Sequence, residues 1–220
     1  MRLVRVILVL LVLLPVAPID AQVITLPRRT TQPAGWTSFH IGFHESQGVN
    51  DGRTGTIWDF GSGLLYRASI EQARPGESSI GLIGSYARLP MSHRGDPACL
   101  ISACNAHGDV WSVLANFRLG GGEGFHQILE FGLGITHYRN FTDDDTGARL
   151  APLDGDSDVT LGVSYGFGYG LSRRTQIMLV QDFATSLHQG DGLQGGERRL
   201  VQQRTTRIGV RYGLGNRAAF

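Results

Sequence analysis

The chain has 220 residues, which suits one domain, and its formal net charge of +1 gives no basic excess for binding nucleic acid. Glycine, with 31 residues, is far above its average share. After the N-terminal segment, no apolar run is long enough for a membrane-spanning helix. A membrane protein of this composition must therefore cross the bilayer with strands that close on themselves, so that no backbone edge meets lipid.

The N-terminal segment has the pattern of an export signal. Arg2 and Arg5 precede an apolar run over 6–16, and Ala21 supplies a small residue at a cleavage point. We expect a secretory signal peptide, with an uncleaved anchor as the alternative, and then a flexible arm rich in proline and threonine. The expected organisation is a signal peptide over 1–21, a periplasmic arm over 22–35 and a single barrel domain over 36–220.

The stretch over 159–171, VTLGVSYGFGYGL, has the clearest strand pattern in the chain. Large apolar residues alternate with small or polar ones, and successive side chains of a strand point to opposite faces. A strand of a transmembrane barrel has this pattern, apolar towards lipid and small or polar towards a narrow lumen. A strand of a soluble barrel or sandwich is the alternative, and recurrence of the pattern decides between them.

The alternation recurs along the chain and predicts an even number of strands. The fold class we predict is all-β, an eight-stranded antiparallel up-and-down transmembrane β-barrel. A soluble β-barrel is the alternative. The predicted strands are 36–44, 56–68, 78–89, 109–119, 125–138, 159–171, 175–186 and 206–214.

The predicted connections alternate between long and short, as in bacterial outer-membrane barrels. We expect the long loops, which begin near Glu45, Pro90, Arg139 and Leu187, to face the outside. The same register produces two girdles of aromatic residues, which favour membrane interfaces. The upper girdle contains Trp58, Tyr86 and Trp111. The lower girdle contains Tyr66, Phe117, Phe125, Tyr169 and Tyr212.

This architecture resembles that of the small eight-stranded outer-membrane barrels, the OmpA-like and OmpX-like group. The resemblance covers 36–220 and rests on the strand pattern and on the terminal strand. Members usually end in an aromatic residue that the barrel-assembly machinery reads, and Phe220 matches, although Asn216 and Ala218 are less hydrophobic than that signal usually is. The resemblance implies an outer-membrane location, contact with lipid and lipopolysaccharide, and insertion by the barrel-assembly machinery.

Several charged residues fall on the inward parity of the predicted strands. An eight-stranded barrel has room for side chains but not for a wide channel, and a buried charge without a partner is costly. We therefore expect a plug of salt bridges, with a gated, narrow ion path as the alternative. His40 and His44 are expected to be polar groups of the lumen. The predicted lumen charges are Asp59, Arg67, Arg118, Glu130, Asp182, Arg207 and Arg211.

The cysteines, Cys99 and Cys104, lie close together in one predicted loop. In an exported protein this spacing favours a disulfide that closes a small loop. Zinc binding with His93 and His107 is the alternative, but the spacing fits no standard zinc pattern.

The sequence favours a structural or surface-interaction role in the outer membrane, with possible surface partners at the external loops. The alternatives are a lipid A-modifying enzyme, resembling the lipid A deacylases, and a narrow small-solute channel. Those deacylases use a His-x-Ser pair, but Arg139 stands two residues after His137, so the nucleophile is missing. We find no catalytic dyad, nucleotide loop or metal constellation, and we predict no enzyme activity, no cofactor and no nucleic-acid partner.

Overall fold

The computed structural model describes residues 32–99, 103–188 and 199–216. The expected signal peptide, most of the expected periplasmic arm and the terminal Phe220 lie outside these ranges. Across the described ranges, no helix is long and apolar enough to cross a membrane.

The described residues form ten strands, and every pairing between them is antiparallel. The strands are β1 (Gly35–Ser46), β2 (Val49–Asp51), β3 (Thr56–Phe60), β4 (Gly63–Arg74), β5 (Ser78–Arg94), β6 (Ala103–Leu119), β7 (Gly124–Asp143), β8 (Asp156–Ser172), β9 (Thr175–His188) and β10 (Arg199–Leu214).

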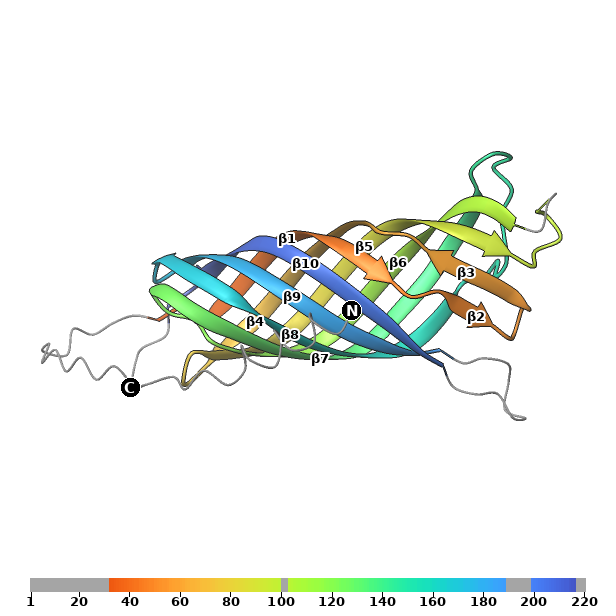
Figure 1. Ribbon diagram of the computed structural model, residues 1–220. Coiled ribbons are helices and arrows are strands. Elements are labelled where there is room, and N and C mark those ends of the chain that lie inside the picture. Colours follow the sequence, from red (N-terminus) through yellow and green to blue (C-terminus); the bar gives the residue numbers. More distant parts are fainter. Residues whose placement is uncertain (1–31, 100–102, 189–198, 217–220) are drawn as a thin grey trace, which may run out of the picture. The chain divides into compact units, whose positions relative to one another are not determined.

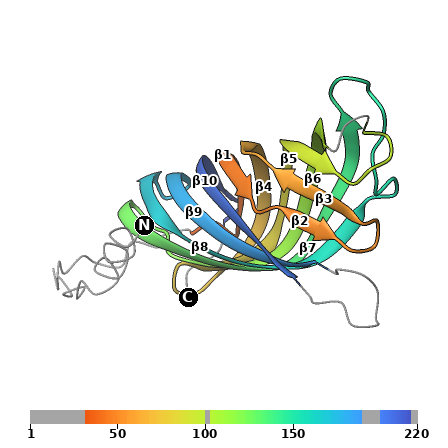
Figure 2. The same cartoon turned by 45° about the vertical axis from the view of Figure 1, so that its right-hand side comes forward.

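Eight of these strands close into a barrel. Starting from β1, the order around the wall is β4, β5, β6, β7, β8, β9 and β10, which pairs again with β1. The predicted eight-stranded antiparallel barrel is confirmed. The short β2 and β3 form a hairpin that extends the wall, because β3 pairs with the part of β5 that lies beyond the beginning of β4. Figures 1 and 2 show the tilted strands and this hairpin at one end of the barrel.

The two ends of the barrel differ in their connections. At one end, which we call the short-turn end, β1 begins, β10 ends, and short turns follow β4, β6 and β8. At the other end, the loop end, lie the β2–β3 hairpin and the longer connections. The predicted alternation of long and short connections is therefore present.

Side chains alternate between the two faces of the wall, most clearly in β8. Its residues from Val159 to Leu171 at odd numbers point outward, and those between them point inward. An inward glycine also leaves room for a neighbouring side chain: a Cβ on Gly168 would overlap the ring of His126 on β7.

The outward face of the barrel carries a belt of large apolar side chains from all eight strands, which we call the lipid belt. Leu133 and Val163, for example, are 55% and 42% exposed. A surface of this kind is far larger than the apolar patches of soluble monomers, and it faces outward while the inner face is polar. Gln181 is a polar residue on this face, and it accepts a hydrogen bond from Thr206 Oγ1 across the strand pair, at 2.6 Å. The belt is the lipid-facing surface of a transmembrane barrel.

The predicted second strand, 56–68, is in fact two strands, and this changes which residues face the lumen. The ladder is interrupted at Gly61 and Ser62, between β3 and β4, and the alternation shifts by one residue there. Trp58 is therefore fully buried inside the barrel instead of in the upper girdle, and Asp59 is exposed instead of in the lumen. Both predictions are wrong because strand parity cannot be carried across such a break.

The other girdle residues are exposed or partly exposed on the outer face, but one lies at a different height. Tyr66 comes early in β4, towards the loop end, because β4 runs on to Arg74 at the short-turn end. The predicted lower-girdle position of Tyr66 is therefore wrong. The expected loop starts at Pro90 and Arg139 are also wrong, because β5 and β7 continue past them.

Candidate functional site

Inside the lipid belt, charged side chains fill the lumen. They form a chain of ion pairs in which the sign alternates, and we call it the charge ladder. Its nitrogen–oxygen distances lie between 2.7 and 3.4 Å. Each carboxylate lies between two guanidinium groups, so each buried charge has an opposite charge beside it. The order along the ladder is Arg67, Asp182, Arg207, Glu130, Arg118, Glu71 and Arg211.

Glu130, on β7, joins opposite parts of the wall. Its two carboxylate oxygens lie 2.7 Å from Arg118 Nη2 on β6 and 2.7 Å from Arg207 Nη2 on β10. Because β8 and β9 separate β7 from β10 in the wall, the pair with Arg207 spans the lumen. Both arginines are fully buried. The described side chains thus meet across the lumen at this level.

Glu71, on β4, fixes the end of the ladder nearest the short turns. One of its oxygens accepts hydrogen bonds from Ser79 Oγ at 2.6 Å and Arg211 Nη2 at 2.7 Å, and the other accepts one from Ser69 Oγ at 2.8 Å. The guanidinium of Arg211 lies over the buried ring of Trp36, 4.2 Å from its centre. This cation–π contact gives the buried charge a second favourable partner beside Glu71.

His40 lies beside the ladder as a neutral group. Arg207 Nη1 lies 2.9 Å from His40 Nδ1 and 3.2 Å from Nε2, and because a guanidinium can only donate, the ring accepts. His40 Nε2 also lies 3.1 Å from Ser38 Oγ. The ring therefore accepts a hydrogen bond from a cation without adding another charge to the lumen.

The structure brings six of the seven predicted lumen charges together and leaves Asp59 outside. It also adds Glu71, which the sequence prediction missed because the predicted strand ended at residue 68. Continuing the alternation from Arg67 through Ser69 would have placed Glu71 on the inward face. His40 and His44 both point inward and are buried, as predicted.

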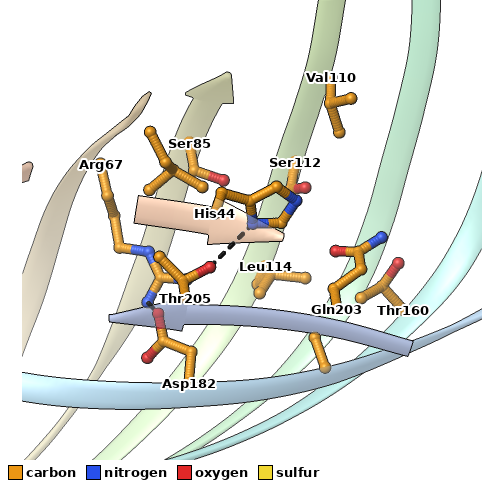
Figure 3. A pocket seen from close by; sticks show the side chains of 12 residues that line it. His44, Arg67, Ser85, Val110, Ser112, Leu114, Thr160, Asp182, Gln203 and Thr205 are labelled. Atoms are coloured by element: carbon orange, nitrogen blue, oxygen red, sulfur yellow. Dashed lines mark hydrogen bonds and ion pairs between the residues drawn. The ribbon is translucent and has the colours of Figure 1, made fainter. Parts of the chain in front are cut away.

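A small cavity lies inside the barrel, on the side of the charge ladder that faces the loop end (Figure 3). The pair formed by Arg67 and Asp182, 3.1 Å apart, belongs to its lining, and His44 Nδ1 shares a hydrogen bond of 2.8 Å with Thr205 Oγ1. The remaining lining residues combine short polar side chains with apolar ones. They are Leu65, Ser85, Val110, Ser112, Leu114, Thr160, Ala184 and Gln203.

Towards the loop end, the interior becomes an apolar core, which we call the loop-end core. Trp58 lies at its centre, with ring centres 4.8 Å from Phe141 and 5.9 Å from Tyr138. Leu65 and Val110 belong both to this core and to the lining of the cavity. The core contains Val49, Trp58, Phe60, Leu65, Ala87, Leu89, Met91, Cys104, Ala106, Val110, Tyr138, Phe141, Leu150 and Val201.

The predicted disulfide between Cys99 and Cys104 is confirmed, with a Cα–Cα distance of 5.4 Å. It ties the connection after β5 to the start of β6, at the edge of the loop-end core. The two histidines of the zinc alternative point elsewhere. His93 Nε2 hydrogen-bonds to the backbone oxygen of Ala151, and His107 contacts Arg88 and Asp144.

At the edge of the lipid belt nearest the loop end, which we call the outer rim, a histidine of β7 and a serine of β8 lie side by side. His137 Nδ1 lies 2.8 Å from Ser157 Oγ, and the two residues are cross-strand neighbours. The sequence prediction looked for this serine two residues along the same strand, where Arg139 stands. The fold instead supplies it from the adjacent strand. In the described part of the chain, no carboxylate hydrogen-bonds to the second ring nitrogen of His137.

The outer rim also carries an aromatic cluster on β5 and β6. The rings of Tyr86 and Trp111 lie 4.5 Å apart, and the guanidinium of Arg139 lies over Trp111 at 5.2 Å. Tyr86 Oη donates to Asp109 Oδ1 at 3.0 Å. Aromatic rings with a polar tip, accompanied by a cation, favour the headgroup region of a membrane.

No protein-family model matches the chain, and no curated protein matches it. Among solved structures, it is similar to Neisserial surface protein A (NspA), with 12% identity over 82% of this chain and 97% of that one, and a TM-score of 0.51. At this identity the likeness shows the fold alone, and that fold agrees with the predicted small outer-membrane barrel.

Two further structures are weaker matches. The N-terminal β-barrel domain of Pseudomonas aeruginosa OprF is 15% identical over 83% of this chain and 98% of that one, with a TM-score of 0.43. OprG of Pseudomonas aeruginosa is 16% identical over 82% and 96% of the two chains, with a TM-score of 0.45.

Proposed function

We propose that this chain is an outer-membrane β-barrel with a structural or surface-interaction role, inserted by the barrel-assembly machinery. The observation that carries this proposal is the contrast between a lumen filled by the charge ladder and an extended loop end. The hairpin, the disulfide and the loop-end core add nothing to crossing a membrane. Their presence beyond the lipid belt supports a surface that meets partners outside the cell. The export-signal pattern before Ala21 supports the location.

The aromatic cluster at the outer rim supports contact with lipopolysaccharide. Arg139, held over Trp111, offers a guanidinium to the phosphate groups of that lipid, which guanidinium binds through charge-assisted hydrogen bonds. In this proposal, the cluster fixes the height of the barrel in the outer leaflet.

Labelling of single cysteines in intact cells tests the orientation. Asp145→Cys places a thiol on the exposed turn after β7, and Arg173→Cys places one on the exposed short turn after β8. Since the native cysteines are paired, the parent chain provides the background. A membrane-impermeant maleimide should label only Asp145→Cys until the cells are permeabilised. Labelling of Arg173→Cys alone in intact cells would show that the barrel is inverted.

Deletion and complementation separate the structural role from the interaction role. Cells lacking the chain are complemented with the full protein or with a variant whose turn over 144–147 is replaced by two glycines. Recovery of envelope integrity with both proteins would favour the structural role. Recovery of a cell-surface binding phenotype with the full protein only would favour the interaction role.

An esterase that acts on acylated lipid at the outer rim is the second candidate function. It rests on the hydrogen bond between His137 and Ser157, because such a base can take the proton of the hydroxyl that attacks an acyl ester. The ester C–O bond then breaks, the alcohol leaves with the proton from His137, and water releases the acyl group from Ser157 as a fatty acid. The lipid A of cells that carry the parent chain or Ser157→Ala is compared by mass spectrometry. Loss of an acyl chain with the parent only would support the esterase, and identical spectra would eliminate it.

A further inference from the structure

Three segments that are distant in sequence meet at the loop end of the barrel. Asp51 ends β2, Asp156 begins β8 and His188 ends β9. One ligand atom from each lies within 4.8 Å of the other two. Each ligand of a bound zinc ion lies about 2 Å from the metal, so ligand atoms around one ion lie about 4 Å apart or less. A small inward movement of these side chains would complete such a site.

His188 gives an independent indication that a ligand belongs there. The side chain is fully buried, yet its Nε2 atom has no hydrogen-bond partner. The nearest carboxylate oxygen, Asp51 Oδ1, is 3.9 Å away, which is too far for a hydrogen bond. Buried polar atoms in proteins are normally satisfied, so an atom of this kind requires an explanation.

The other ring nitrogen of His188 is held in the manner of a metal ligand. His188 Nδ1 lies 3.1 Å from both carboxylate oxygens of the buried Asp158. A proton on Nδ1 donates to this carboxylate and leaves the lone pair of Nε2 directed towards Asp51 and Asp156. Histidines that bind metals are usually oriented by a carboxylate in this way.

The surroundings of Asp51 and Asp156 fit this role. Asp51 is fixed by the backbone N–H of Arg53 at 2.9 Å and by Thr54 Oγ1 at 2.6 Å. The guanidinium of Arg53 is 3.8 Å from Asp156 and donates to the backbone oxygen of Gly155 at 3.0 Å, but its side chain is 54% exposed, so in water it can give up this contact when a cation binds. Asp156 is only partly buried, which leaves room for water to complete the coordination.

We propose that Asp51, Asp156 and His188 bind a divalent transition-metal ion, with Zn²⁺ as the preferred ion. One imidazole and two carboxylates suit zinc and its neighbours, whereas Ca²⁺ and Mg²⁺ take sets made of oxygen alone. The ion holds the tip of the β2–β3 hairpin against the start of β8 and the end of β9. It thereby stiffens the part of the barrel that faces the outside.

Zinc titration of the refolded, chelator-treated protein in detergent tests this site, with bound zinc measured after equilibrium dialysis. The parent chain and the control Asp154→Asn, an exposed neighbour, should bind one ion. Asp156→Asn should weaken binding by at least about 10–100-fold, because that range already applies to groups that only orient a ligand, and Asp156 is a ligand in this proposal. His107→Gln should also bind one ion, because His107 pairs with Asp144 and is not one of the three proposed ligands.

Trypsin cleavage after the exposed Arg53 provides the structural readout. Zinc should slow this cleavage in the parent chain and in Asp154→Asn, but not in Asp156→Asn. The mobility shift of folded barrels on unheated gels confirms that each variant is folded. Parent protein that binds no zinc, or Asp156→Asn that binds and is protected like the parent, would overturn the proposal.

Discussion

The lumen is built differently at two levels of the same barrel. Within the lipid belt it holds Arg118, Glu130 and Arg207, whereas at the loop end it holds Trp58 and Phe141. The outer surface changes in the opposite sense, from a continuous apolar belt to a surface that is mostly polar, with Leu153 and Leu200 as exposed apolar residues. A wall surrounded by lipid places its apolar side chains outward, and a wall surrounded by water places them inward. The barrel therefore joins a membrane-spanning part to a part that is packed like a soluble protein.

The comparison is tested most strongly at the centre of the charge ladder. Glu130→Gln should destabilise the barrel by about 3–5 kcal/mol, because it leaves the buried charges of Arg118 and Arg207 without their shared partner. Urea unfolding from detergent micelles measures this loss. The matched control is Glu123→Gln, which removes an exposed pair with Arg173 and should cost less than about 1 kcal/mol. Equal effects of the two variants would show that the ladder does not stabilise the barrel.

Trp58→Ala tests the loop-end core. Loss of this buried ring should cost about 3–5 kcal/mol within the loop-end core. We expect the loop end to loosen while the strands of the lipid belt remain folded. Trypsin should then cut faster after Arg94 and Arg149, while the protein keeps the gel mobility of a folded barrel. Trp111→Ala, on the outer face, is the control. Complete unfolding of Trp58→Ala would show that the two levels are one cooperative unit.

The lipid belt is tested by arginine at its middle. Leu133→Arg and Val163→Arg should each cost about 2–4 kcal/mol at the bilayer midplane and impair refolding into lipid vesicles. Asp145→Arg, on the exposed turn at the loop end, should refold like the parent chain. Parent protein that is folded and monomeric in plain buffer would contradict the membrane assignment, whatever the variants did.

The smallest expected effect concerns the turn after β7. The N–H of Thr146 donates to Asp143 Oδ1 and lowers the pKa of this carboxyl. Desolvation raises this pKa, and the hydrogen bond from the N–H of Asp145 lowers it further. A lowered pKa in the folded state stabilises the turn above the unfolded value of about 4, and this stabilisation is lost as the pH falls through the folded pKa. Amide protection factors of Asp145 and Thr146 should therefore fall in acid, and in Asp143→Asn they should not depend on pH.

The sequence predicted the membrane-spanning level well, because one rule of alternation holds there. Val159 to Leu171 needed only that rule, and the same rule found most of the charge ladder. It failed where the surroundings change from lipid to water. Pro90 and Arg139 looked like the starts of loops because the outward residues beyond them are polar, although β5 and β7 continue.

Other features depend on contacts that alternation does not encode. The break at Gly61 reverses the faces of Trp58 and Asp59, and a pattern of residue types does not reveal where a strand is interrupted. The pairing of His137 with Ser157, like the meeting of Asp51 with His188, depends on strand register across the barrel. Such pairs can be recognised only after the strands have been placed beside one another.

Planar-bilayer recording of the refolded chain without residues 1–21 tests the central claim, that the charge ladder closes the lumen and leaves function to the loop end. Insertion is verified beforehand by the gel mobility of the same protein in lipid vesicles. We predict that the bilayer stays at its baseline conductance over the physiological voltage range, because Glu130 forms ion pairs that span the lumen. Reproducible single-channel steps from protein with the ladder intact would contradict this account and favour a small-solute channel.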